Sequence, residues 1–189
     1  MRFRFAALML KPMNELDQLW SEKLSAAIEN ARGTGRADVA DYLELKAAND
    51  AVRQAGIDQL LGTMIEIATR PAYASKKISV ERESPHNFRH RGANMVGSLL
   101  RLTYGVRCMT IEAGWTRTPT DGFMRLGALA FSRITHLGIP RANAELILKG
   151  SGENTLWFTV RDDKADKKIE MDQLNEHFSV FIGETINNV

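Results

Sequence analysis

The residues best suited to chemistry lie together in the middle of the chain. Residues 81–95, ERESPHNFRHRGANM, contain three arginines and two histidines within ten positions: Arg82, His86, Arg89, His90 and Arg91. Arginine offers a planar fork of N–H donors that fits phosphate and carboxylate groups, and histidine exchanges a proton near neutral pH. We therefore expect an anion site in which Arg89 and Arg91 bind the ligand and His86 and His90 are candidates for proton transfer.

A second group of functional side chains begins near the end of the apolar run VRCMTIEA, residues 106–113, and continues after it. Glu112 is a candidate general base, Trp115 could stack on a nucleic-acid base, and Arg117 could bind phosphate. A purely structural interpretation stays open, in which Glu112 is the internal partner of an arginine and Arg91 pairs with a nearby glutamate.

The two histidines, His86 and His90, are four residues apart. On a helix this spacing places both rings on one face, where they could bind a divalent metal with a third ligand from Glu112, Asp121 or His136. The same pair could act as general acid and base without a metal. We predict no cofactor, and a divalent metal is the alternative.

The elements that position these residues are predicted from the spacing of apolar side chains. Ser84 is a good N-cap, Pro85 suits the first helical position and Gly105 a helix end, so residues 84–105 are predicted to be helical. The same reasoning predicts further helices over residues 13–31, 38–69, 121–137 and 170–186. Strands are predicted over residues 5–10, 77–82, 106–113, 144–149 and 155–161, the last two joined as a hairpin.

Strands that alternate with helices predict an α/β fold, with a mixed, mostly parallel sheet, helices on both faces and an N-terminal helical extension. Residues 1–75 would form a strand and long helices packed on a core domain of residues 76–189. The alternative is an α+β fold of the split ferredoxin-like type. Ligands of open α/β sheets bind beyond the carboxyl ends of the strands, so both groups of residues should face one crevice. A helix beginning at Ser84 would add unpaired N–H groups and partial positive charge there.

Composition and missing motifs restrict the function. Residues 76–149 carry twelve basic and five acidic side chains, net +7, whereas residues 1–75 and 150–189 carry net charges of −1 and −4. The single cysteine, Cys108, excludes an internal disulfide and fits a cytoplasmic protein. No run of about 18 apolar residues predicts a membrane span. The sequence contains no GxxxxGK[ST], GxSxG, HExxH or CxxC motif.

These features predict a cytoplasmic protein that binds a phosphate-bearing ligand, either a nucleic acid or a nucleotide, at its central Arg/His-rich crevice. If the protein is an enzyme, it should be a hydrolase of phosphodiester or phosphoryl groups. One alternative is a non-catalytic subunit or adaptor whose N-terminal helices contact a partner protein or a second copy of the chain. Another is an enzyme acting on a small anionic metabolite.

Overall fold

Seven antiparallel strands, paired in the order in which they occur along the chain, form one sheet in the computed structural model of this protein. The structure describes residues 15–151 and 154–184, so the predicted strand over residues 5–10 lies outside the described residues. The strands are β1 (Ser79–His90), β2 (Ala93–Tyr104), β3 (Arg107–Trp115), β4 (Ala130–His136), β5 (Ala144–Ser151), β6 (Asn154–Arg161) and β7 (Lys164–Lys168).

The described residues also form three α-helices, α1 (Glu15–Gly33), α2 (Ala37–Ala68) and α3 (Met171–Ile182), close to where the apolar spacing predicts them. Short 3₁₀ turns lie at Pro71–Lys76, Pro119–Asp121, Arg125–Gly127 and Pro140–Ala142. Among the described residues, none of the helices combines the length and the apolar character needed to cross a membrane.

The chain divides into two compact units, residues 1–48 and residues 49–189, with the boundary inside α2. In the first unit, Arg32 of α1 forms a 2.6 Å ion pair with Glu44 of α2, and Ala31 and Ala40 are buried. Tyr42 and Leu45 of the same unit expose more than half of their surface.

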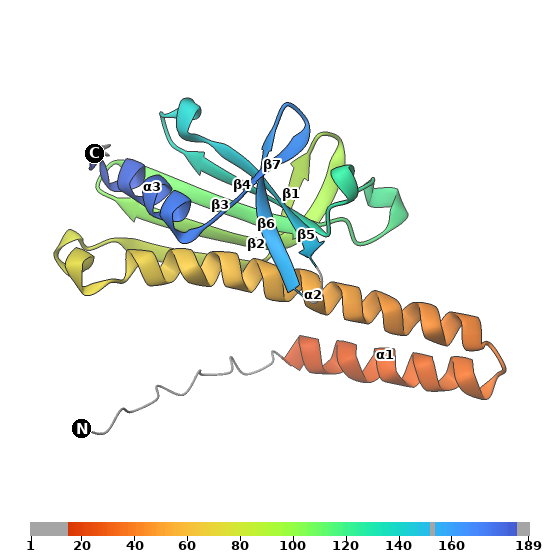
Figure 1. Cartoon of the computed structure of the whole chain (residues 1–189). Coiled ribbons are helices and arrows are strands. Elements are labelled where there is room, and N and C mark those ends of the chain that lie inside the picture. The colour runs from red at the N-terminus through yellow and green to blue at the C-terminus, as the bar shows by residue number, and fades with distance from the viewer. Residues whose placement is uncertain (1–14, 152–153, 185–189) are drawn as a thin grey trace, which may run out of the picture. The chain divides into compact units, whose positions relative to one another are not determined.

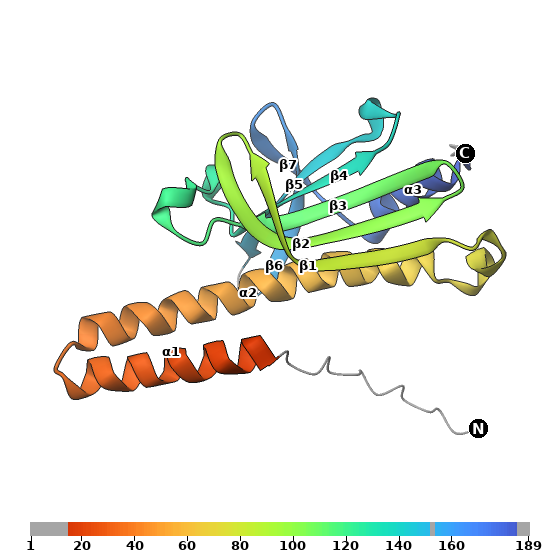
Figure 2. The same cartoon turned by 180° about the vertical axis from the view of Figure 1, so that it is seen from behind.

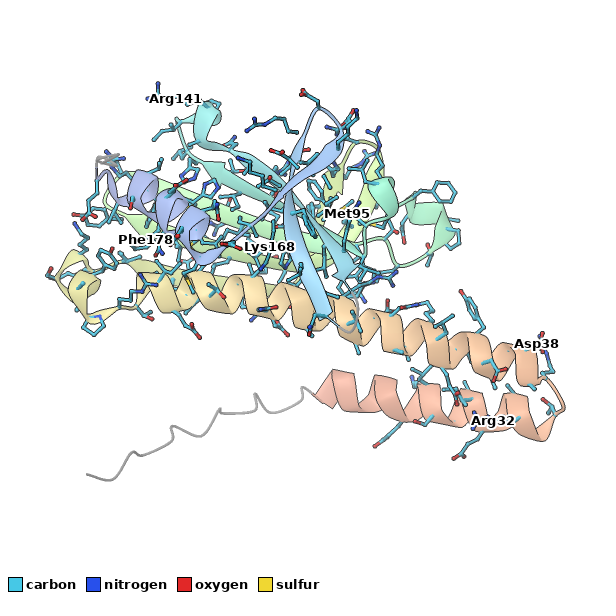
Figure 3. All side chains as sticks on the ribbon, in the orientation of Figure 1. Arg32, Asp38, Met95, Arg141, Lys168 and Phe178 are labelled. Atoms are coloured by element: carbon cyan, nitrogen blue, oxygen red, sulfur yellow. The ribbon has the colours of Figure 1, made fainter. Side chains whose placement is uncertain are left out.

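In the second unit, residues 49–68 of α2 and the whole of α3 cover one face of the sheet (Figure 1). Phe178 of α3 is buried between the two helices, as Figure 3 shows. We call the covered side the helix face. The side chains that fill its core come from α2 (Ile57, Leu60, Leu61, Met64, Ile67), from α3 (Leu174, Phe178, Phe181) and from the strands (Leu100, Leu102, Met109, Ile111, Ile134, Leu146, Leu148, Trp157).

Two tryptophans attach α2 to the sheet by hydrogen bonds. The indole N–H of Trp157 in β6 donates to the carbonyl of Gly56 at 2.9 Å, and that of Trp115 in β3 donates to Asp50 at 3.0 Å. Gly56 does not interrupt the helix. It lets α2 approach β5 closely, because a Cβ atom at this position would lie 2.6 Å from Cδ2 of the buried Leu148.

The predicted mostly parallel sheet is wrong, because every strand pairs antiparallel with its neighbour in a continuous meander. The split ferredoxin-like alternative does not fit either, since no α-helix lies between β1 and β7 in the described part of the chain. The strand predictions over residues 106–113, 144–149 and 155–161 are confirmed by β3, β5 and β6.

The predicted helix over residues 84–105 is wrong, because this segment forms most of β1 and all of β2. Arg91 and Gly92 have φ angles of 46° and 87° and form a tight two-residue hairpin turn. Pro85 lies at a register shift in the edge strand, where a missing N–H is tolerated. β2 is buried on both faces, with Leu100 on the helix face and Leu99 on the other, so its apolar residues imitate helical spacing.

The predicted helix over residues 121–137 is also wrong, since its second half forms β4. In AFSRITH, residues 130–136, Ile134 faces the helix face and Phe131 and Arg133 face the other side. This alternation with period two is the pattern of a strand. The coincidental spacing of Phe123 and Gly127 with later apolar residues suggested the helix.

The side of the sheet away from α2 and α3, which we call the opposite face, carries a smaller apolar cluster that includes Phe88, Met95, Phe131 and Ile147. Beside it, the two outermost hairpins meet, because Arg91 in the β1–β2 turn pairs with Asp163 in the β6–β7 turn. Figures 1 and 2 show these two hairpins side by side at one end of the sheet. The opposite face is therefore partly enclosed at this end.

The close contact at Gly56 can be tested against a second glycine of the same helix. A Cβ atom at Gly62 would meet no atom within 4 Å, so Gly62→Ala should raise the free energy of unfolding by about 0.5–1 kcal/mol through helix propensity. Gly56→Ala should leave the protein about 1–3 kcal/mol less stable than Gly62→Ala, because the new methyl group displaces Leu148. Urea unfolding followed by circular dichroism measures both. Equal stabilisation by the two substitutions would contradict the close packing.

Candidate functional site

Polar side chains from four neighbouring strands line an open groove on the opposite face. We call it the opposite-face groove, and its lining residues are His86 of β1, Leu99 and Arg101 of β2, Thr110 and Glu112 of β3, Arg133 and Thr135 of β4, and Asn143.

The strand register explains why these residues meet. Leu99 pairs with Glu112, and Glu112 pairs with Arg133, so the three form one row across the sheet. Thr110 pairs with Arg101 on one side and with Thr135 on the other, which gives a second row. Directly paired residues point to the same side of a sheet, as do residues two apart in a strand, so both rows project from the opposite face.

Glu112 is held at both carboxylate oxygens. Its Oε1 lies 3.1 Å from Nε2 of His86, and its Oε2 accepts a 3.1 Å hydrogen bond from Nε of Arg133 as well as a second one from Nη2. The Glu112 side chain is only 17% exposed. Its position and orientation are therefore fixed by two cationic neighbours.

The charges in this cluster stabilise one another. Burial by itself raises the pKa of Glu112, but the hydrogen bonds and charges of Arg133 and His86 outweigh it, and the pKa lies below its ordinary value. Partial burial by itself lowers the pKa of His86, but Glu112 and Glu83 outweigh it, and the pKa lies above its ordinary value. Around pH 6.5 the arrangement therefore favours an imidazolium beside a carboxylate.

The second ring nitrogen of His86 has a weaker partner. Nδ1 lies 3.1 Å from Oε1 of Glu83, whose side chain is 59% exposed on the edge strand. A solvated carboxylate on an exposed side chain is displaced more easily than the enclosed Glu112. Nδ1 is therefore the ring atom of His86 whose partner is displaced more easily.

The structure separates the residues that were predicted to form one site. His86 and Glu112 meet, but His90 lies beyond Phe88 on the same strand, with its ring stacked on Phe131 at 3.7 Å between centroids. Its Nδ1 lies 3.8 Å from Glu145. His86 and His90 lie on the same face of the strand, but four residues along a strand span roughly 13 Å, so the two rings are too far apart to bind one metal.

The three arginines predicted to bind an anion occupy three different surroundings. Arg91 pairs with Asp163 and Glu145 at the hairpin turns. Arg117 places its guanidinium 3.6 Å from the ring centroid of Trp115, and burial lowers its pKa. Arg89 is exposed on the other side of β1 from His86, and within the described ranges it forms no hydrogen bond or ion pair.

Trp115, predicted to stack on a base, is 1% exposed and belongs to the helix-face core. The positive helix end predicted at Ser84 is absent, because that residue lies within β1. The attraction for an anion therefore has to come from side chains.

Five residues of the groove were missed by the sequence reasoning, namely Leu99, Arg101, Thr110, Thr135 and Asn143, and the role of Arg133 was missed with them. The available signal was the alternation of residues 130–136, which places Arg133 and Thr135 on one face if the segment is interpreted as a strand. Asn143 carried no such signal, since it follows a turn and its Oδ1 accepts a 2.8 Å hydrogen bond from the backbone N–H of His136.

A second pair of titratable groups lies between β4 and α3. His136 is 3% exposed, and its Nε2 lies 3.1 Å from Nδ1 of His177 with the two rings stacked. Burial, with a smaller contribution from the charge of His177, lowers the pKa of His136 to about 4. Burial also lowers the pKa of His177. Both rings are therefore neutral at pH 7.

Metal binding has no cluster to support it in residues 15–151 and 154–184, where no group of three or more His, Cys, Asp or Glu side chains is arranged to hold an ion. Comparisons of the chain with protein-family models, with curated proteins and with solved structures gave no match. The geometry of the groove therefore carries the functional argument.

The coupling between His86 and Glu112 can be measured directly. In Glu112→Gln the pKa of His86 should fall, because the carboxylate that stabilises the imidazolium is gone. In Glu83→Gln the fall should be smaller, since Glu83 is more exposed. An NMR titration of the histidine ring protons compares the three proteins. An unchanged pKa in Glu112→Gln would contradict the contact.

The buried histidine pair predicts a loss of stability in mild acid. The folded-state pKa of His136, about 4, lies below its ordinary value of 6.5. Its contribution is therefore complete above pH 6.5, and roughly 3 kcal/mol is lost as the pH falls to 4. His136→Gln should show a smaller decrease over this interval in urea unfolding at pH 7, 5.5 and 4.5. Parallel decreases in the two proteins would contradict this assignment.

Proposed function

We propose that the opposite-face groove binds a phosphate-bearing ligand, either a nucleotide or a nucleic acid strand. One observation carries the proposal. Arg101, Arg133 and His86 converge on one open face, and Glu112, the only acidic residue among the eight that line the groove, is already neutralised by two of them. An anion that enters the groove therefore meets cationic groups, and the two other carboxylates that contact them, those of Glu81 and Glu83, belong to exposed side chains outside the lining.

Several hydrogen-bond donors in the groove are unused. Nε and Nη2 of Arg133 donate hydrogen bonds to Glu112, which leaves Nη1 without a partner among the described residues. In residues 15–151 and 154–184, Arg101 has one polar contact, from Nη1 to the exposed Glu81 at 3.3 Å, and its own side chain is 45% exposed. The hydroxyl groups of Thr110 and Thr135 form no hydrogen bond within the described part of the chain. Phosphate oxygens accept several such bonds at once.

The shape and the charge both favour recognition of phosphate over recognition of a base. Of the eight lining residues only Leu99 is apolar, so there is no enclosing wall for a planar ring. The segment from residue 76 to residue 149, which supplies all eight residues, has a net charge of +7. Binding that relies on phosphate contacts depends strongly on salt, because bound cations are released from the nucleic acid.

The catalytic part of the proposal concerns His86. A phosphate that replaced Glu83 at Nδ1 would meet an imidazolium oriented by Glu112 on the far side of the ring. This is the geometry of a general acid that protonates a leaving oxygen. Hydrolysis of a phosphodiester or phosphoryl group would be the reaction that uses it.

The binding proposal predicts an effect that depends on position. Arg101→Glu in the groove should weaken the binding of a labelled single-stranded 20-mer by about tenfold or more, because a phosphate contact is lost and a repulsive charge is added. Arg89→Glu makes the same change of charge on the other side of β1 and should have a much smaller effect. Fluorescence anisotropy measures both affinities at salt concentrations from about 50 to about 200 mM, a range over which counterion release changes the affinity strongly.

The same titrations with mononucleotides decide between the two ligand classes. Equal losses in Arg101→Glu and Arg89→Glu would show unspecific attraction and contradict the groove. Failure of the wild-type protein to bind any phosphate compound would contradict the whole proposal. If the wild-type protein binds the nucleic acid but does not cleave it, the catalytic part alone is wrong. The same holds if it cleaves the nucleic acid and His86→Gln cleaves it at the same rate.

A further inference from the structure

A second hollow lies on the opposite face, between the two hairpins that meet at one end of the sheet. We call it the hairpin pocket. Its wall is formed by Arg91 and Met95 of the β1–β2 hairpin, by Phe123 and Arg125 of the segment between β3 and β4, and by Phe131 and Ile147 of β4 and β5. Met95 is labelled in Figure 3. None of these six residues lines the opposite-face groove.

The floor of the hairpin pocket is formed by buried apolar side chains. Met95, Phe131 and Ile147 are each less than 5% exposed and belong to the smaller apolar cluster. The ring of His90 stacks on Phe131 at 3.7 Å between centroids. A floor of this kind favours an aromatic or aliphatic group over a polar one.

The rim carries a chain of alternating charges that ends beside the ring of His90, whose pKa is held below its ordinary value by burial. Arg125 lies 3.8 Å from Asp163, Asp163 pairs with Arg91, Arg91 contacts Glu145 at 3.4 Å, and Glu145 contacts His90. Asp163 is therefore flanked by two arginines, and Glu145 pairs with Arg91. The hydrogen-bonding groups at the rim that remain free for a ligand are therefore N–H donors of the basic residues.

Arg125 holds most of these free donors. Its side chain is 56% exposed, and its only ion pair within the described part of the chain is the 3.8 Å contact with Asp163. Among the described residues its guanidinium forms no hydrogen bond, so its five N–H donors are available to a ligand. A carboxylate or sulfonate on a ligand could bind there without displacing Arg91 from Asp163.

The segment between β3 and β4 adds an exposed apolar group at the opening. Phe123 is 81% exposed although it borders an apolar hollow. Three residues later, Leu126 has a φ angle of 61°, a left-handed conformation that is unfavourable for leucine. A ligand that covered Phe123 would remove a phenyl ring from water at no cost to the core.

We propose that the hairpin pocket binds a small organic anion whose aromatic or aliphatic body rests on Phe131, Met95 and Phe123 while its charged group bonds to Arg125. This second site is separate from the phosphate groove and does not depend on it. The two sites differ in chemistry, since the hairpin pocket needs an apolar body and the groove does not.

Two fluorescent probes with the same ring system test the proposal, the anionic 1-anilinonaphthalene-8-sulfonate and the neutral N-phenyl-1-naphthylamine. Phe123→Ser should weaken both probes by about tenfold, because the ring that covers their body is lost. Arg125→Ala should weaken the anionic probe by about tenfold and leave the neutral probe nearly unchanged. Fluorescence titration gives each dissociation constant, and urea unfolding confirms that every variant is folded.

Two controls make the result specific. Val106→Ser removes an apolar side chain that is 94% exposed elsewhere and should leave both affinities unchanged. Arg101→Glu alters the phosphate groove and should also leave them unchanged, which separates failure of this site from failure of the groove. Loss of binding in Val106→Ser equal to that in Phe123→Ser, or an unchanged affinity of the anionic probe in Arg125→Ala, would overturn the proposal.

Discussion

The packing of α2 on one face of the meander is the constraint on which the rest of the second unit depends. An antiparallel sheet needs one face covered by apolar side chains and can leave the other to water. Trp115 and Trp157 fasten α2 to β3 and β6 by donating to Asp50 and to the Gly56 carbonyl, and α3 completes the cover. Because the helix face supplies most of the buried apolar core, the opposite face is free to carry polar and functional side chains.

The register of the meander decides what the opposite face contains. Cross-strand partners at the centre bring Glu112 against Arg133 and Thr110 against Thr135, which gives a polar groove. Toward one end of the sheet β4 and β5 present Phe131 and Ile147, and the meeting of the two outer hairpins encloses them. One continuous face therefore offers two neighbouring sites of different chemistry. Phe131 of the hairpin pocket and Arg133 of the groove are two positions apart along β4.

Charge compensation explains why so basic a segment does not present a uniformly basic surface. Arg82 pairs with Asp58 of α2, Arg91 with Asp163 of the β6–β7 turn, and Arg133 with Glu112. Acidic residues before and after the segment thus neutralise part of its net charge of +7. Cations with spare donors border both the groove and the hairpin pocket, namely Arg101, Arg125 and one nitrogen of Arg133. Position, more than number, determines where an anion is attracted.

The sequence by itself determined the helices α1, α2 and α3 and the strands β3, β5 and β6, because helical spacing over many residues and a hairpin signal are local properties. It also indicated His86 and Glu112 as candidates for proton transfer, and in the structure His86 Nε2 lies 3.1 Å from Glu112 Oε1. Only the tertiary structure decided that residues 84–104 form two strands, since apolar residues buried on both faces of β2 follow no local period that distinguishes strand from helix. The antiparallel order, the separation of His90 from His86 and the contact of Arg133 with Glu112 follow from these strands. Cross-strand neighbours are set by the register between distant segments, and no local pattern encodes them.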